Sequence, residues 1–281
     1  MVSVTATGSV TKLADFLERY RNLLLLTGAG ISTASGIPDY RDPNGVRRGK
    51  APVQGPEFRR SQAVRQRYWA RSMAGWPLLA QAQPNPGHRA IAELEANGRL
   101  AGIVTQNVDG LQQRAGSLRI VELHGNIHSV VCLDCGAQFS RGLIQSLLEK
   151  NNPDWLVPIP LPAPDGDAHL EPAQLGDFHI PYCLHCAGTL QPDVVFFGDG
   201  VPRTRTEAAE KWLQDADALL VVGSSLMVYS GYRLCRLAAE AGKPIVAINL
   251  GKTRADHLLS FKTEQPSQQA LPLLAHLLRA R

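Results

Sequence analysis

The stretch LLLLTGAGIS, residues 23–32, decides the fold because a run of apolar residues passes straight into a Gly-x-Gly turn. Four leucines and a threonine in succession indicate a short strand buried on both faces, as strands of parallel sheets are. Glycine after such a strand lets the backbone approach a phosphate closely, and helix-terminal amides favour the negative charge. We therefore predict a dinucleotide-binding loop at Gly28-Ala29-Gly30, although such turns also occur simply to make a tight corner.

The same loop departs from the fingerprint of dehydrogenases. Its third glycine is Gly36, six residues after Gly30. No acidic residue follows at a strand end about twenty positions on, where dehydrogenases bind the ribose. A dehydrogenase is therefore the least favoured interpretation, and some other use of a dinucleotide is preferred.

Strand-like and helical patterns alternate outward from this segment. We expect strands at residues 23–27, 103–105, 120–123, 218–222 and 244–249, and helices at 10–20, 88–96 and 232–241. Such alternation implies a parallel sheet covered on both faces. The predicted fold class is α/β, with a Rossmann-like doubly wound parallel sheet.

Four of the five cysteines form two Cys-x-x-Cys pairs, Cys132 with Cys135 and Cys183 with Cys186. Each pair presents two thiolates on one tight turn, and two such turns close a tetrahedral Zn²⁺ site. In a chain without a secretion signal, metal is favoured over disulfides. Four protein ligands leave no open position, so the zinc is expected to be structural. The fifth, Cys235, is expected to be a buried small hydrophobe.

Two stretches interrupt the alternation and predict a smaller zinc-binding domain formed by insertions. Residues 40–85 are expected to cap the edge of the sheet, and residues 129–192 carry the cysteine pairs. A proline-rich irregular loop is expected at 151–181, with Pro164-Asp165-Gly166-Asp167 inside it. We assign residues 1–40, 86–128 and 193–281 to the Rossmann-like dinucleotide-binding domain, 41–85 to a helical and cofactor-loop insertion, and 129–192 to the zinc-binding domain. The cleft between the domains is where chemistry is expected.

Polar residues gather where the expected strands end. Gln106, Asn107 and Asp109 follow one strand, and His124 closes the next. Both places face the ligand crevice of an open parallel sheet. An imidazole with a pKa near neutrality is suited to removing a proton from a sugar hydroxyl, which makes His124 the candidate general base. Other histidines, such as His88, do not lie at a strand end near such polar residues in the sequence, and they are taken as structural or surface residues.

Composition places the chain among soluble globular proteins. Its 281 residues are 44% hydrophobic and 19% charged, and no apolar run approaches the roughly 20 residues needed to span a bilayer. The N-terminus lacks a signal-peptide pattern, so a cytoplasmic location is expected. The net charge of +4 comes from scattered basic residues, which favours a solvated surface over nucleic-acid binding. We expect a monomer with neither a membrane nor a nucleic-acid partner.

The motifs taken together resemble the sirtuin family, in the order that sirtuins have them. They are Gly28-Ala29-Gly30-Ile31-Ser32, Gly36-Ile37-Pro38-Asp39-Tyr40-Arg41, Thr105-Gln106-Asn107-Val108-Asp109, Glu122-Leu123-His124-Gly125, the two cysteine pairs, Phe197-Gly198-Asp199, Gly223-Ser224-Ser225-Leu226 and Asn249-Leu250-Gly251. The resemblance covers the chain from about Leu13 onward. Further segments, among them Val228-Tyr229-Ser230-Gly231-Tyr232-Arg233, resemble the class II branch, which includes a mitochondrial lipoamidase and ADP-ribosyltransferase of animals.

The resemblance implies a protein-lysine deacylase that consumes NAD as a co-substrate. The acyl-lysine carbonyl oxygen would attack the ribose carbon as nicotinamide leaves, and His124 would then act as general base on the ribose hydroxyls. The products would be O-acyl-ADP-ribose and free lysine. Asn107 and Asp109 would orient the ribose and the nicotinamide carboxamide.

The resemblance also assigns the binding residues. The NAD pocket would comprise Gly28, Ala29, Gly30, Ser32, Asp39, Tyr40, Arg41, Gln106, Asn107 and Asp109, with Gly223, Ser224, Ser225, Asn249, Leu250, Gly251 and Ser267 at its phosphate and adenosine end. An acylated-lysine peptide would add as a strand between Phe197-Gly198-Asp199 and residues 226–229, which include Val228. Three positions depart from many sirtuins: Tyr40 replaces Phe, Ser224 replaces Thr and Ser230 replaces Pro. The last of these bears on the peptide groove.

The acyl preference stays open at this point. Tyr68-x-x-Arg71 matches in spacing a pair with which desuccinylating sirtuins hold an acyl carboxylate, and an Arg fork could bind such a group. The same residues also fit a plain helix pair in a basic stretch. Two rival functions remain: a protein mono-ADP-ribosyltransferase that shares the NAD site, and a non-catalytic NAD-sensing or zinc-ribbon binding module. The presence of His124 weighs against the second rival, because binding alone requires no base.

Overall fold

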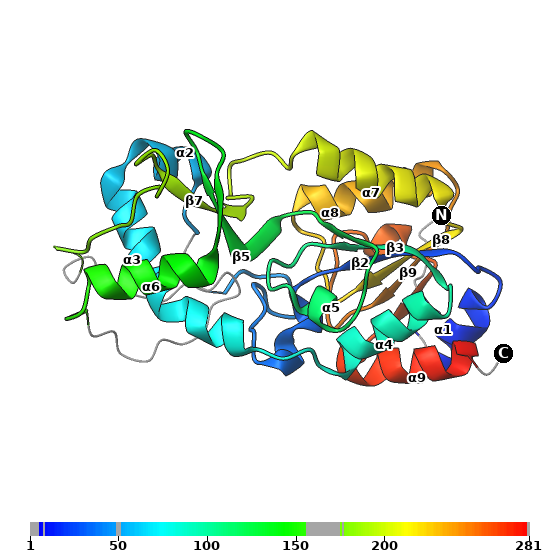
Figure 1. The fold of residues 1–281 in the computed structure, drawn as a ribbon. Coiled ribbons are helices and arrows are strands. Elements are labelled where there is room, and N and C mark those ends of the chain that lie inside the picture. The colour runs from blue at the N-terminus through cyan, green and yellow to red at the C-terminus, as the bar shows by residue number, and fades with distance from the viewer. Residues whose placement is uncertain (1–5, 8, 49–51, 156–174, 176, 280–281) are drawn as a thin grey trace.

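The computed structural model describes residues 6–7, 9–48, 52–155, 175 and 177–279, arranged as a larger and a smaller domain (Figure 1). The larger domain is built on a seven-stranded sheet with the order β1-β10-β9-β8-β2-β3-β4, in which every pairing is parallel. Its strands are β1 (Ala6–Thr7), β2 (Leu23–Thr27), β3 (Leu100–Thr105), β4 (Ile120–Glu122), β8 (Ala218–Val222), β9 (Ile245–Ile248) and β10 (Phe261–Thr263). The predicted parallel α/β sheet is confirmed, with β2 in its interior between β8 and β3.

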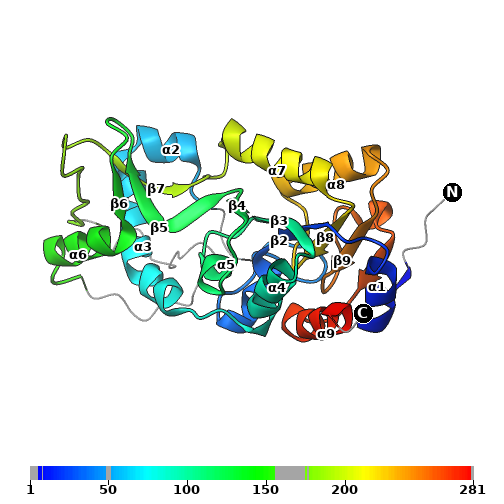
Figure 2. The same cartoon turned by 45° about the vertical axis from the view of Figure 1, so that its right-hand side comes forward.

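Helices cover both faces of this sheet, as Figures 1 and 2 show. One face carries α1 (Val10–Leu17), α4 (Pro86–Ala96) and α9 (Ser267–Arg279), and the other carries α7 (Arg203–Asp215) and α8 (Tyr229–Glu240). All five residues of β2 and of β8 are buried, because side chains pointing to either face meet a helical layer. In a strand covered on both sides, every side chain is buried, so polar residues do not alternate with apolar ones. This explains the unbroken run of leucines.

The smaller domain contains a three-stranded antiparallel sheet of order β6-β5-β7. Its elements are β5 (Gly125–Cys132), β6 (Gln138–Ser140), β7 (Leu190–Val194), α2 (Gly55–Arg60), α3 (Gln62–Gln81) and α6 (Arg141–Asn151). Strand β5 begins at Gly125 and β7 ends at Val194, so the small sheet extends across the boundaries expected at 128/129 and 192/193. Most of the predicted loop at 151–181, with Pro164-Asp165-Gly166-Asp167, lies outside the described residues.

The helices of the first insertion, α2 and α3, pack in the smaller domain and not on the edge of the parallel sheet, so for them the expectation was wrong. Phe58, Trp69 and Met73 from α2 and α3 are buried in one cluster with Val130 of β5 and Ile144 of α6. The two insertions therefore share a hydrophobic core and form one domain together. Trp69, only 1% exposed, is among the largest side chains of this cluster.

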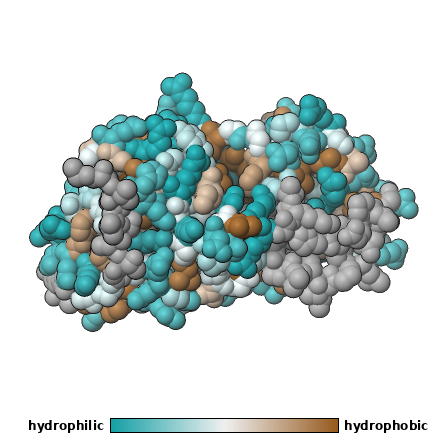
Figure 3. All heavy atoms as spheres, turned by 180° about the vertical axis from the view of Figure 1, so that it is seen from behind, coloured by the Kyte–Doolittle hydropathy of each residue, from teal (hydrophilic) through white to brown (hydrophobic). Residues whose placement is uncertain are grey.

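The surface and the helices match a globular chain. Seen from the side opposite to Figure 1, hydrophilic residues cover most of the described surface, and hydrophobic ones gather between the two halves of the molecule (Figure 3). Within the described part of the chain, no helix combines the length and apolar character that crossing a bilayer requires. Cys235 is fully buried in α8, as expected for a small hydrophobe.

Candidate active site

A cavity of about 810 Å³ is lined by residues that follow β2, β3, β4, β8 and β9, and by residues of the smaller domain. Because these strands are parallel, their carboxyl ends meet at one edge of the sheet. The volume lies in the range of small-molecule and cofactor sites. The cavity is lined by most of the expected binding and catalytic residues, namely Gly28, Ala29, Gly30, Ser32, Asp39, Tyr40, Arg41, Tyr68, Gln106, Asn107, Asp109, His124, Phe197, Gly198, Gly223, Ser224, Ser225, Val228, Asn249, Leu250 and Ser267. Gly251 and Arg71 do not line it.

The glycine loop after β2 packs directly on the loop after β8. The Gly30 N–H donates to the Gly223 carbonyl at 2.8 Å. A Cβ on Gly30 would lie 2.9 Å from both the Cα and the carbonyl oxygen of Gly223. Glycine is required here for the approach of one loop to the other, a reason that the sequence motif alone did not reveal. The Ser267 hydroxyl at the start of α9 lies 3.4 Å from the Gly30 carbonyl oxygen and closes the loop from the other side.

Asp109 and Asn107 are held by a buried hydrogen-bond network. The Ser32 hydroxyl donates to the Asp109 carboxylate at 2.7 Å, and the Asn107 side-chain amide donates to Ser32 Oγ and to the Gly28 carbonyl, both at 3.1 Å. Asp109 is 5% exposed, and its second oxygen accepts the Leu111 N–H at 2.9 Å. The carboxylate is therefore engaged on both oxygens, and Ser32 Oγ links it to the side-chain amide of Asn107.

His88 belongs to this network, although it lies 56 positions from Ser32 along the chain. Its Nε2 lies 3.5 Å from Ser32 Oγ, and its Nδ1 accepts the Asn85 backbone N–H at 3.3 Å. Burial lowers the pKa of His88 to about 4, and the charge of Asp109 opposes this shift only in part. His88 is thus a neutral, structural histidine, as expected, but one in contact with Ser32 of the site. Only the fold brings α4 to the glycine loop, so spacing along the chain gave no signal of it.

The side chain of Gln106 joins three strand ends. Its amide donates to the Thr27 carbonyl at 3.2 Å and to Ser224 Oγ at 2.8 Å, and its backbone N–H donates to the same Thr27 carbonyl at 3.0 Å. These bonds tie the end of β3 to the ends of β2 and β8. The Gln106 carbonyl consequently occupies a fixed position at the floor of the cavity.

His124 receives a hydrogen-bond partner on each ring nitrogen. Nδ1 lies 2.9 Å from the Gln106 carbonyl oxygen, and Nε2 lies 2.7 Å from Ser230 Oγ. A carbonyl can only accept, so Nδ1 carries the ring proton and Nε2 presents its lone pair. Burial lowers the pKa of His124, the bond to Gln106 opposes this, and the positive charge of Arg205 lowers it further. The imidazole is therefore held neutral in a defined tautomer, which is the form a general base requires.

Two segments expected to hold a peptide face the cavity from opposite sides. The Phe197 carbonyl accepts the Gly55 N–H at 2.9 Å, and the Arg59 guanidinium binds Asp199 through two bonds of 2.9 and 2.6 Å. Helix α2 thereby fixes the strand-like segment that contains Gly198. On the other side, Val228 is 40% exposed before α8 begins. No pattern in the sequence points to the Arg59 contact, because it joins residues 140 positions apart.

Tyr68 and Arg71 differ in their position relative to the cavity. The Tyr68 ring packs edge-on against Phe58 and Phe196, with centroid distances of 5.4 and 5.3 Å, and lines the cavity. Arg71, one turn further along α3, is 9% exposed and does not line it. The two residues share a helix face, but only the aromatic one borders the open space.

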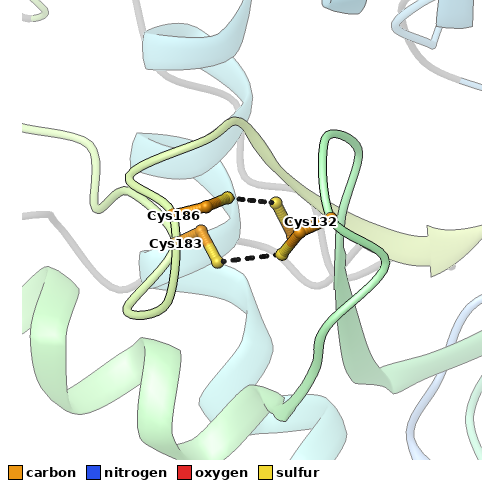
Figure 4. Close-up of side chains that lie close together, drawn as sticks. Cys132, Cys183 and Cys186 are labelled. Carbon is orange, nitrogen blue, oxygen red and sulfur yellow. Dashed lines mark hydrogen bonds between the residues drawn. The ribbon is translucent and has the colours of Figure 1, made fainter.

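The four cysteines of the two pairs form one cluster, and Figure 4 shows the sulfurs of Cys132, Cys183 and Cys186 pointing toward one another. Cys132 Sγ lies 3.6 Å from Cys186 Sγ, and Cys135 Sγ lies 3.7 Å from Cys183 Sγ, with all four sulfurs within 4.8 Å of one another. Zn–S bonds of about 2.3 Å in a tetrahedron place the sulfurs about 3.8 Å apart. The cluster therefore fits a zinc ion, with four ligands and no position left for a reactant.

Comparison of the sequence with protein families and with known proteins agrees with this description of the site. A model of the Sir2 family matches residues 28–230. An NAD-dependent protein deacetylase of Xanthomonas campestris pv. campestris (strain 8004) is 51% identical over 97% of this chain and 92% of its own length. The NAD-dependent protein lipoamidase sirtuin-4, mitochondrial, of Bos taurus is 48% identical over 94% of this chain and 85% of its own.

Solved structures agree with the sequence relatives. A structure concerned with the mechanism and regulation of Sir2 enzymes has a TM-score of 0.78 at 32% identity, over 97% of this chain and 99% of the other. A Sir2 complex with a p53 peptide and NAD⁺ has a TM-score of 0.78 at 28% identity, over 96% and 98%. The family model, the relatives and the shared fold together show that this chain belongs to the Sir2 family.

Proposed function

We propose that the chain is an NAD-dependent protein-lysine deacylase, which moves an acyl group from lysine to the ADP-ribose part of NAD and releases nicotinamide. The observation that carries this proposal is His124, a neutral imidazole fixed at the floor of a cavity lined by the glycine loop. A protein that only binds NAD needs no base at this place. Relatives named as NAD-dependent deacetylase and lipoamidase support the same class of reaction.

NAD, as substrate, fits the strand-end loops. Asn107 and Asp109, held by the Ser32 network, are assigned to the nicotinamide ribose and carboxamide. Backbone amides and hydroxyls around Gly28 and Ser224 suit the pyrophosphate. The adenosine end is assigned to the segment after β9, where Asn249 is 7% exposed and its side-chain amide binds the Leu250 and Gly251 carbonyls at 3.1 and 3.2 Å. Gly251 then acts by shaping this turn and not by lining the cavity.

His124 acts in the second stage of the reaction. After the acyl oxygen has displaced nicotinamide from the ribose carbon, Nε2 takes a proton from a ribose hydroxyl, and the resulting oxygen attacks the acyl carbon. Nε2 is the ring nitrogen that takes up this proton, because Nδ1 already carries a proton that it donates to the Gln106 carbonyl. Loss of the lysine amine and addition of one water molecule to the same acyl carbon then give O-acyl-ADP-ribose and free lysine.

The acylated peptide is assigned to the gap between the segment Phe197–Asp199 and the segment before α8. Both segments line the cavity and have exposed portions, as a strand-adding site requires. The acyl chain would then run toward Tyr68 and Phe196, whose rings form an apolar wall. Because Arg71 does not line the cavity, we propose that neutral acyl chains are preferred to acidic ones.

The test is mass spectrometry of one peptide carrying different acyl groups on its lysine, incubated with enzyme and NAD. We expect loss of the acyl group with formation of the matching O-acyl-ADP-ribose, fastest for acetyl or longer neutral chains. A clear preference for succinyl or glutaryl chains would instead restore a role for Arg71. Intact acyl groups together with ADP-ribosylated protein would refute the deacylase and favour an ADP-ribosyltransferase. Absence of any NAD consumption would leave a binding module.

A further inference from the structure

The hydrogen bond between His124 Nε2 and Ser230 Oγ is not explained by substrate binding. At 2.7 Å it is a short contact, and both residues line the cavity. The bond engages the very lone pair that the proposed reaction needs. Because Nδ1 already carries the ring proton, the Ser230 hydroxyl must be the donor in the resting protein. Proline, which many sirtuins have at this position, could not make such a bond.

Ser230 is presented by a well-anchored turn. It is the second residue of α8, whose first turn closes with the Tyr232 N–H bonded to the Val228 carbonyl at 3.3 Å. The Arg254 guanidinium lies 4.4 Å from the centroid of the Tyr232 ring and covers the same turn. Gly231 packs so closely on Gln106 that a Cβ there would lie 2.6 Å from its side-chain oxygen. Gln106 and the start of α8 are thus in contact, with the imidazole bonded to both.

We infer that Ser230 is a positioning residue for the general base, fixing the His124 ring from the side opposite Gln106 and stabilising its protonated form. A hydroxyl can donate to the neutral ring and, after proton uptake, accept the new Nε2–H bond. The second bond is charge-assisted and therefore stronger than the first. Ser230 consequently favours the imidazolium and works against the effect of burial. This inference rests on the proposed deacylase function, in which His124 gains a proton.

Other charged groups around the ring do not replace this contribution. They are Arg205 of α7 with its partner Asp193 of β7 at 3.1 Å, Glu122 at the end of β4, Asp109 after β3, and the Arg233–Glu210 pair of α8 and α7 at 2.7 Å. Arg205 disfavours the imidazolium, and the carboxylates of Asp193 and Glu210 each face an arginine. Ser230 is the neutral group in direct contact with Nε2.

Three variants separate the hydroxyl from the space it fills. Ser230→Ala removes the group, Ser230→Cys keeps its approximate size with a weak donor, and Ser230→Thr keeps the hydroxyl. The first readout is the pKa of His124, measured by NMR titration of the imidazole in the full-length protein. We expect it to fall by about one unit in the Ala and Cys variants, because a charge-assisted bond is lost. The Thr variant should stay close to the native protein.

The second readout measures two stages of the reaction separately: the loss of nicotinamide, and the later formation of O-acyl-ADP-ribose. Exchange of labelled nicotinamide into NAD reports the first stage, and O-acyl-ADP-ribose formation reports the stage that needs the base. In the Ala and Cys variants, product formation should fall by about tenfold while exchange is retained, and the acid limb of the rate profile should move to lower pH. The Thr variant should restore product formation.

Two outcomes would overturn the inference. One is an unchanged His124 pKa and unchanged product formation in Ser230→Ala. The other is a parallel fall of exchange and product formation with an unchanged pKa, which would show a packing role only. Failure of the deacylase proposal is distinct, because the native protein would then form no O-acyl-ADP-ribose, whereas the NMR titration would still test the bond between Ser230 and His124.

Discussion

Replacement of Gly30 by alanine tests the close approach of the two loops at the carboxyl edge of the sheet. The added Cβ would lie 2.9 Å from the Gly223 Cα and carbonyl oxygen and 3.1 Å from its carbonyl carbon. All three neighbours are backbone atoms, so no side chain can rotate away. Ordinary carbon–carbon contact begins at about 3.5 Å, and the loops must therefore separate by roughly 0.6 Å. That movement stretches the 2.8 Å bond from the Gly30 N–H to the Gly223 carbonyl.

The cost of such overpacking is about 1–3 kcal/mol. We expect Gly30→Ala to lower the melting temperature by several degrees, since 1 kcal/mol corresponds to about 2–4 °C in a chain of roughly this size. Because the strained loop also faces the cavity, the dissociation constant for NAD should rise by about tenfold or more, which equals about 1.4 kcal/mol. Thermal unfolding by circular dichroism and calorimetric titration with NAD measure the two effects.

Gly142→Ala is the matched control. Gly142 lies in the first turn of α6, and a Cβ there would meet only the edge of Trp76, at 3.9 Å. Alanine in a helix is more favourable than glycine by about 0.5–1 kcal/mol, so this variant should be as stable as the native protein or slightly more so, with unchanged NAD binding. Native stability and native NAD affinity in Gly30→Ala would refute the steric argument, as would an equal loss in the control.

Three further predictions follow from the described site. His124→Ala should abolish deacylation while the melting temperature and zinc content stay close to native, and retained turnover would contradict the assigned base. Removal of zinc by a chelator, or the substitution Cys132→Ala, should lower the melting temperature and the soluble yield, because the metal holds the small domain together. Metal analysis and a thermal scan measure the zinc content and the melting temperature. An unchanged melting temperature would count against a structural role for the zinc. For His88, the folded-state pKa of about 4 lies below the unfolded value of about 6.5, so the unfolded chain binds more protons between these values. Stability should be complete above about pH 6.5 and fall by roughly 3 kcal/mol toward pH 4, whereas His88→Gln should flatten this dependence in urea titrations.

The sequence predicted the parallel sheet well because buried strands carry an unmistakable apolar signature. The ranges 23–27 and 218–222 agree with β2 and β8 residue for residue. The cysteine pairs were equally informative, since metal ligation depends on residue type and local spacing. Cytoplasmic location and monomeric state remain predictions.

What the sequence did not reveal depends on contacts between distant segments. Helix α3 packs in the small domain and not on the sheet edge, because Trp69 and Met73 find their partners in β5 and α6. Ser230 was recognised as a departure from many sirtuins, but its bond to His124 joins residues 106 positions apart. His88 reaches Ser32 across 56 positions. Pairings of this kind have no periodicity along the chain.

The interior place of β2, between β8 and β3, has a consequence for synthesis on the ribosome. This strand leaves the exit tunnel early, and β3 can pair with one of its edges soon afterwards. Its other edge must wait for β8, which begins at Ala218. During that interval the nascent chain carries four leucines beside an unpaired backbone edge, which is the kind of segment that promotes association between chains. Translation speed and chaperone supply, in addition to final stability, should therefore influence how much of this protein is recovered in folded form.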